Sequence, residues 1–159
     1  MSINSIAPGK KAPSFSLPVA GGDYAEGATV TLASLKGQNV VLYFYPKDDT
    51  PGCTIQACSI RDGWDRIHQK AAVFGVSIDP IKSHAEFIKK HSLPFPLFSD
   101  ELKEMVEAYG MWVEKSMYGK KYMGTERSTV IIGPEGNIKT VLRNVQPAAH
   151  LELVLQALG

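Results

Sequence analysis

The amino-acid sequence predicts an α/β fold in which a central mixed β-sheet is flanked by helices. Two continuous apolar runs, at residues 39–46 and 72–79, have the pattern of strands buried on both faces of a sheet. Each run is followed by a helical segment, and the chain closes with a hairpin pattern and a last helix. The sequence contains no internal repeat or linker, so residues 1–159 are predicted to form one domain with a sizeable core.

The first third of the chain predicts a small β-hairpin followed by a strand and a helix. Short β-prone pieces at residues 15–17 and 29–32 lie on either side of the turn residues Gly21 and Gly22. The run "NVVLYFYP" then predicts the first buried strand, which ends at Pro46. A helix is expected from about residue 51 to residue 69.

The remaining elements complete the order of a thioredoxin-like sheet. An amphipathic helix at residues 82–91 follows the second buried strand, and a short helix is expected at residues 102–109. A polar stretch rich in Lys and Tyr follows at residues 114–126, and within it "KSMYGKKYMG", residues 115–124, predicts a solvated loop. "RSTVIIG" and "NIKTVLRN" predict an antiparallel hairpin around a Pro-Glu-Gly turn, and "AAHLELVLQAL" predicts the last helix. This order is typical of a thioredoxin-like sheet covered on both faces, but a fold alone assigns no function.

Composition and charge exclude several classes of partner. Seventeen Lys and Arg against sixteen Asp and Glu give a net charge of +1, which leaves no electrostatic footprint for nucleic acid or an anionic membrane. The first twenty residues lack the apolar core of a secretory signal, and no apolar run approaches the length of a membrane span. We therefore expect a cytoplasmic protein, in which two nearby thiols indicate catalysis or metal binding rather than a structural bridge.

Both cysteines of the chain lie in "PKDDTPGCTIQAC", at the expected start of a helix. Thr50 is a suitable N-cap, and Pro51 suits the first helical position because its missing N–H would be unpaired there. Cys53 then occupies the third position, among free backbone N–H groups at the positive end of the helix dipole, which favours the thiolate. The alternative is a buried cysteine that acts only as a small apolar side chain.

A helical projection separates the two thiols. At about 100° per residue, Cys53 shares a core-facing stripe with Ala57 and Ile60, whereas Cys58 lies about 140° away, near Asp62 on the polar side. Five residues along an intact helix separate two Cα atoms by about 8 to 9 Å, beyond the roughly 7 Å limit for a disulfide. The two cysteines can pair only if the first turns of the helix unwind.

Other uses of this pattern are less well supported. Zinc would require further Cys or His ligands, and the four histidines show no paired spacing, so no metal is expected. A redox dithiol of the thioredoxin type uses Cys-x2-Cys, a shorter spacing than Cys-x4-Cys. Lys and Tyr interleave in "KSMYGKKYMG" as in some nucleic-acid binders, but three lysines in a nearly neutral chain more often form a solvated loop.

The motif Pro46-x3-Thr50-x2-Cys53 resembles the active-site motif of the peroxiredoxins. The longer "YFYPKDDTPGCTIQAC", with "KKAPSFSLP", "FPLFSD" and "EKSMYGKKYMGTERSTVII", resembles the branch of bacterioferritin comigratory proteins, also called peroxiredoxin Q. The resemblance implies that Cys53 is the peroxidatic cysteine and Cys58 the resolving cysteine. It also implies that Pro46, Thr50 and Arg127 complete the active site, whereas Arg127 taken alone would be expected to be an exposed charge at a strand edge.

The resemblance further implies an activity and its partners. The expected enzyme is a thiol-dependent peroxidase, without cofactor, that reduces hydrogen peroxide and organic hydroperoxides and forms a disulfide between Cys53 and Cys58. Thioredoxin or a similar dithiol protein would recycle this disulfide, and the protein is expected to be a monomer. Two alternatives come from other classes. A general disulfide oxidoreductase would reduce protein disulfides without a rapid reaction with peroxide, and a non-catalytic binding module would be unaffected by Cys53→Ser.

Overall fold

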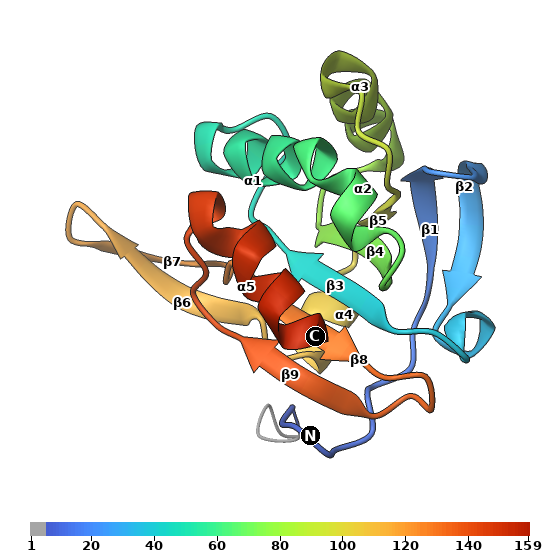
Figure 1. Ribbon diagram of the computed structural model, residues 1–159. Coiled ribbons are helices and arrows are strands. Elements are labelled where there is room, and N and C mark those ends of the chain that lie inside the picture. The colour runs from blue at the N-terminus through green and yellow to red at the C-terminus, as the bar shows by residue number, and fades with distance from the viewer. Residues whose placement is uncertain (1–5) are drawn as a thin grey trace.

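A computed structural model describes residues 6–159 and shows a seven-stranded mixed sheet in the order β2-β1-β5-β4-β3-β8-β9 (Figure 1). The strands are β1 Ser16–Gly21, β2 Tyr24–Thr31, β3 Val40–Phe44, β4 Ala72–Ser77, β5 Leu97–Ser99, β6 Trp112–Met117, β7 Lys120–Thr125, β8 Ser128–Ile132 and β9 Ile138–Leu142. The α-helices are α1 Pro51–Asp62, α2 Trp64–Ile67, α3 Ile81–His91, α4 Glu104–Ala108 and α5 His150–Leu158, and short 3-10 turns span Ala33–Leu35 and Pro147–Ala149. The predicted central mixed sheet flanked by helices is confirmed.

The centre of the sheet is the buried strand pair that the sequence predicts. β3 pairs in parallel with β4 and antiparallel with β8, and all five of its residues are buried. Successive side chains of a strand point to opposite faces. Val41 and Tyr43 therefore pack under α1, α2, α3 and α5, while Val40 and Leu42 belong to a second cluster with α4 on the other face.

The N-terminal hairpin is confirmed, and each of its strands is longer than predicted. β1 and β2 pair antiparallel, and β1 also pairs with the short strand β5, which joins the hairpin to the sheet. Strand β5 was not predicted from the sequence. Its three residues lie in "LPFPLFSD", where two prolines obscure the strand pattern.

The helix predicted for residues 51–69 is wrong in its length. α1 ends at Asp62, Gly63 interrupts the helix, and α2 adds a single turn. A Cβ atom at Gly63 would overlap the side chain of Leu151 from α5. The close packing of α5 on this bend, rather than local helix propensity, therefore explains why a glycine lies there.

The solvated loop predicted for residues 115–124 is also wrong. β6 and β7 form a separate two-stranded antiparallel sheet that projects from the body of the molecule (Figure 1). The hairpin exposes the large side chains of Met117, Tyr118, Tyr122 and Met123. Its strands lack a buried face along most of their length, so the hydrophobic alternation that identifies a strand is missing from the sequence. Among residues 6–159, no helix is long and apolar enough to cross a membrane.

Candidate active site

The candidate active site lies where β3 passes into α1. Pro46 lies two residues after the end of β3, and the loop at residues 46–50 leads into Pro51, the first residue of α1, as predicted. Cys53 is the third residue of the helix, and only 1% of its surface is exposed. It packs in the core cluster on the helix-covered side of the sheet with Ala57 and Ile60, as the projection predicts.

Arg127 reaches the sulfur of Cys53. It lies between the end of β7 and the start of β8, and its Nη2 atom donates a hydrogen bond to Cys53 Sγ over 3.4 Å. A charge-assisted hydrogen bond of this kind is stronger with a thiolate than with a thiol. A Cβ atom at Gly52 would lie 3.0 Å from Nη2, so the absence of a side chain at Gly52 lets the guanidinium approach. The alternative of an exposed arginine at a strand edge is therefore wrong.

Gln56 is a site residue that was not predicted from the sequence. It is fully buried in the first turns of α1, and its Oε1 accepts a hydrogen bond of 2.7 Å from Arg127 Nη1. This hydrogen bond fixes the Nη1 side of the guanidinium, and the Nη2 side points to Cys53. In the sequence, a glutamine three residues after Cys53 looks like an ordinary surface residue of a helix. Its role is revealed only by its contact with Arg127 in the structure.

Thr50 is the N-cap residue by position, but its side chain does not cap the helix. Its hydroxyl donates to the backbone oxygen of Lys47 over 2.8 Å, and no side-chain cap hydrogen bond forms. The prediction that Thr50 accepts a cap hydrogen bond is thus wrong. Asp49 adopts a left-handed conformation with φ 57°, which brings Lys47 and Thr50 together in a turn that takes up the hydroxyl.

Cys58 lies in the same unbroken helix as Cys53, and both thiols are free. It is half-exposed and lines a groove of about 580 Å³ together with Ile55, Asp62 and residues from α5 and the preceding turn. Ile55 is itself 53% exposed. The predicted division into an enclosed thiol and a thiol nearer the surface is confirmed by these exposures.

A cleft of about 520 Å³ opens beside the guanidinium of Arg127. Pro46, Val113, Lys115 and Arg127 line part of it, so the cleft joins the β3–α1 loop to the projecting hairpin. The pKa of Lys115 is lowered, first by burial and then by the neighbouring charge of Arg127, while Cys53 acts in the opposite direction. The cleft therefore places two cationic side chains near the enclosed thiol.

Two buried side chains near Arg127 and Cys53, those of Tyr43 and His150, are held in their neutral forms. Burial, followed by the Cys53 sulfur, raises the pKa of Tyr43 well above its usual value. Burial, followed by the charge of Arg127, lowers the pKa of His150 from 6.5 to about 4. At neutral pH both groups are uncharged, so Arg127 keeps its electrostatic effect on the sulfur.

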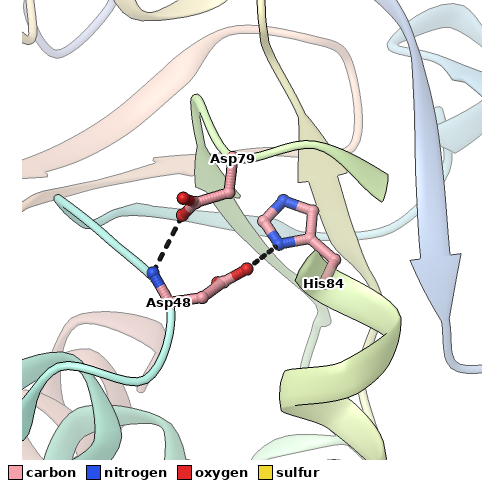
Figure 2. A group of neighbouring side chains, drawn as sticks. All are labelled: Asp48, Asp79 and His84. Carbon is pink, nitrogen blue, oxygen red and sulfur yellow. Dashed lines mark hydrogen bonds and ion pairs between the residues drawn. The ribbon is translucent and has the colours of Figure 1, made fainter. Parts of the chain in front are cut away.

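Three residues that can bind metals meet between the β3–α1 loop, the β4–α3 connection and α3. Asp48, Asp79 and His84 each offer a ligand atom, and these atoms lie within 4.8 Å of one another (Figure 2). They form the one such group among residues 6–159, and neither cysteine belongs to it. Hydrogen bonds already engage both ring nitrogens of His84 and both carboxylate oxygens of Asp48.

The arrangement of Cys53 and Arg127 is suited to nucleophilic attack on a peroxide. A thiolate is a strong nucleophile, and fixed cationic donors beside it can stabilise the negative charge that develops on a departing oxygen. The enclosed position of the sulfur limits the approach of larger reactants. On a thioredoxin-like sheet, this site defines a peroxidase of the peroxiredoxin class.

Comparison with known proteins identifies the family. The model of the "AhpC/TSA family" matches residues 8–141, which is most of the chain. The chain is 45% identical to "Putative peroxiredoxin bcp" of Coxiella burnetii, over 95% of its own length and 97% of that protein. It is 43% identical to "Peroxiredoxin Bcp" of Bacillus subtilis, over 97% of its own length and 96% of that protein. The protein therefore belongs to the AhpC/TSA family, and its relatives are Bcp or peroxiredoxin Q proteins.

Solved structures agree with this placement. Peroxiredoxin Q of Xanthomonas campestris superposes with a TM-score of 0.82 at 38% identity, covering 91% of this chain and 89% of that one. A PrxQ mutant of Xylella fastidiosa superposes with a TM-score of 0.87 at 34% identity, covering 96% and 95%. The resemblance stated from the sequence is confirmed, and so is the thioredoxin-like fold.

Proposed function

We propose that the protein reduces hydroperoxides by a cycle in which Cys53 is oxidised and Cys58 resolves it as an intramolecular disulfide. The observation that carries this proposal is the 3.4 Å contact between Arg127 Nη2 and the buried Cys53 sulfur, with a second, more exposed thiol in the same helix. A reduced protein needs both thiols free, as they are here.

The first step is attack of the Cys53 thiolate on the terminal oxygen of the hydroperoxide. A sulfur–oxygen bond forms, the oxygen–oxygen bond breaks, and the leaving alkoxide or hydroxide takes up a proton to become an alcohol or water. Cys53 is left as a sulfenic acid. Full ionisation of an ordinary thiol of pKa about 8.5 gains at most about 30-fold at neutral pH, so faster reaction requires donors aimed at the peroxide. Arg127 supplies such donors, and Thr50 can add one by turning its hydroxyl away from Lys47.

The second step joins the two cysteines. The Cys58 thiol attacks the sulfenic sulfur, the disulfide forms, and the hydroxyl leaves as water. An intact helix holds the two Cα atoms about 8 to 9 Å apart, so the first turns of α1 must unwind before the bond can form. The start of α1 contains Gly52 and precedes the half-exposed Cys58, which makes this stretch suited to local opening.

The third step is reduction by thioredoxin or a similar dithiol protein. A thiolate of the donor attacks the disulfide, and the second donor thiol then releases the donor in oxidised form, so that both protein cysteines are again thiols. Attack on the Cys58 sulfur is favoured, since it makes Cys53, stabilised by Arg127, the leaving thiolate.

Several further properties belong to the proposal. A solved structure of the Xanthomonas campestris bacterioferritin comigratory protein concerns the "Alkyl Peroxide Reduction Activity" of that protein, which supports organic hydroperoxides as substrates here. We further propose that the protein acts in the cytoplasm, where a dithiol donor is kept reduced. We also predict that the protein is a monomer. The β6–β7 hairpin exposes apolar side chains, and a second copy that covered them would contradict this prediction.

Stopped-flow oxidation followed by mass spectrometry tests the cycle. We expect wild-type protein to react rapidly with hydrogen peroxide and an organic hydroperoxide, and then to yield one peptide pair linked through Cys53 and Cys58. Cys58→Ser should consume a single equivalent of peroxide and accumulate a sulfenic acid, whereas Cys53→Ser should consume none. Peroxide consumption by Cys53→Ser, or sustained turnover of Cys58→Ser with thioredoxin, would contradict the assignment.

A further inference from the structure

Asp48 ties the β3–α1 loop to the β4–α3 connection and to α3, and through His84 to β5. Its backbone N–H donates to Asp79 Oδ2 in the β4–α3 connection over 2.8 Å, and its Oδ1 accepts from the Tyr45 hydroxyl over 2.6 Å. Its Oδ2 accepts from the Ser83 hydroxyl over 2.7 Å. The same oxygen lies 2.7 Å from Nδ1 of His84, in the first turn of α3 (Figure 2). His84 Nε2 is in turn 2.8 Å from the backbone oxygen of Phe98 in β5.

The hydrogen-bond partners place the hydrogens of this network, except the one that lies between Asp48 and His84. The Phe98 carbonyl can only accept, so His84 Nε2 must carry a hydrogen. Burial and the nearby carboxylate raise the pKa of Tyr45 well above its usual value, so its hydroxyl is a donor to Asp48. Oδ1 of Asp48 is then an acceptor, and one more hydrogen lies in the 2.7 Å contact between Asp48 Oδ2 and His84 Nδ1. Carried on Nδ1, this hydrogen makes His84 an imidazolium paired with an ionised Asp48, and the two side chains then form a buried ion pair.

The pair is buried, unlike the neighbouring pair in the same loop. The side chains of His84 and Asp48 are 0% and 3% exposed, whereas Asp49 is 45% exposed in its ion pair with Lys90. A buried ion pair must be well satisfied by hydrogen bonds, because either charge left alone in the interior is strongly unfavourable. Asp48 therefore resists displacement far more than Asp49, although the two are adjacent in sequence.

The loop that Asp48 holds carries two residues of the active site. Pro46 lines the cleft beside Arg127, and Thr50 directly precedes α1, whose third residue is Cys53. Small displacements of reacting groups can cost about 100-fold in rate. We propose that the buried Asp48–His84 ion pair positions residues 46–50, and through them Thr50 and the start of α1, for attack by Cys53 on peroxide. This inference rests on the proposed role of Cys53, and Asp48 and His84 act as positioning residues that do not touch the substrate.

A second consequence concerns the opening of α1. Because Asp48 is anchored to the β4–α3 connection and to α3, unwinding that begins at the helix start meets a fixed boundary at residue 48. The anchor keeps Pro46 and the turn at residues 47–50 in place while the two cysteines approach. After reduction, the helix can re-form from this fixed end.

Metal binding is the competing use of the same side chains. An ion bound by Asp48, Asp79 and His84 would have to replace the hydrogen on His84 Nδ1 and separate two atoms that now lie 2.7 Å apart. The hydrogen bond from His84 to the Phe98 carbonyl is compatible with an ion pair and with a metal site, since metal-bound histidines often make such a bond. The protonation of Nδ1 thus distinguishes an ion pair from a metal site.

Rate measurements on four variants test the positioning role. We expect Asp48→Ala and His84→Gln to lower the second-order rate constant of Cys53 oxidation by about 10- to 100-fold, with an unchanged circular dichroism spectrum. Asp48→Asn should retain most of the rate, because its amide can donate to a neutral His84 Nδ1 while its oxygen still accepts from Tyr45. Asp49→Asn, in the same loop but exposed, is the matched control and should react at the wild-type rate.

Nitrogen-15 NMR of the His84 imidazole ring tests the ion pair in the wild-type protein. This test remains valid even if an alanine variant fails to fold. Hydrogens on both His84 ring nitrogens at neutral pH, unchanged when Zn²⁺ is added, are expected. A single ring hydrogen, or its loss on metal addition, would overturn the ion pair, and wild-type oxidation rates in Asp48→Ala and His84→Gln would overturn the positioning role. Absence of any peroxide reaction in the wild-type protein itself would instead remove the proposed function on which the inference rests.

Discussion

Replacing Arg127 by glutamine tests the electrostatic part of the mechanism. The guanidinium makes two contacts in the site, 2.7 Å to Gln56 Oε1 and 3.4 Å to Cys53 Sγ. Glutamine removes the positive charge and is too short to keep both contacts. It retains a polar amide, so the change removes the fixed cation from the thiol while keeping a polar group in the cleft.

The size of the effect follows from the contact that is lost. A hydrogen bond to a charged group contributes about 1.5 to 3 kcal/mol, and each 1.36 kcal/mol in the barrier changes a rate tenfold. If the contact from Nη2 acts fully on the charge that develops during attack, Arg127→Gln should slow Cys53 oxidation by about 10- to 150-fold. The loss should appear in the second-order rate constant with peroxide, since this step contains the attack.

Stopped-flow fluorescence is a suitable assay, because Trp64 packs against the same core cluster as Cys53. The matched control is Arg66→Gln, which removes an exposed arginine whose partner is Glu152 at the surface. We expect the control to react at the wild-type rate. An oxidation rate for Arg127→Gln within about threefold of wild type, with the fold intact, would refute the role given to the guanidinium.

Three further predictions concern packing, pH and the active-site turn. Gly63→Ala should lower the free energy of unfolding in urea by about 1 to 3 kcal/mol because its Cβ would overlap Leu151, although helix propensity alone favours alanine; an unchanged midpoint would contradict the packing argument. Stability should fall as the pH drops from 6.5 toward 4. The reason is that His150 has its pKa lowered to about 4 by burial, so the unfolded chain takes up that proton first. The full shift corresponds to about 3 kcal/mol, and a His150→Gln variant with the same pH dependence in urea unfolding would refute this assignment. Thr50→Val should lose about 1 kcal/mol of stability with the hydrogen bond to Lys47 and should also slow oxidation by peroxide; wild-type values in denaturation and stopped-flow assays would exclude both effects.

The buried elements of the fold were predictable because their side chains carry the signal. The strands around Val41 and Val73 are apolar on both faces, and the helix from Ile81 has a marked apolar side, so local pattern and tertiary position agree. The hairpin of β6 and β7 was missed because hydrogen bonds between two exposed strands leave no apolar alternation in the sequence. The break at Gly63 depends on Leu151 from a distant helix, which no local window contains.

The candidate site was likewise predictable only in part from the sequence. Cys53 at the third helical position followed from the cap and proline chemistry of the segment, and its burial followed from helix periodicity. Gln56 and the Asp48–His84 pair could not be predicted, since their roles come from contacts with residues 71 and 36 positions away in sequence. The hydrogen bond of the Thr50 hydroxyl differs from the predicted cap. The left-handed backbone at Asp49 brings the Lys47 carbonyl within reach, and the hydroxyl donates to it.

Amide hydrogen exchange of α1 in the reduced and disulfide forms tests the central claim most directly. The helix that holds Cys53 and Cys58 must open when the two thiols are joined. We expect the amides of residues 53–58 to exchange much faster in the peroxide-oxidised protein than in the reduced protein, while β3 stays equally protected in both. Equally slow exchange across residues 53–58 in the two forms would contradict a Cys53–Cys58 disulfide formed by unwinding of this helix.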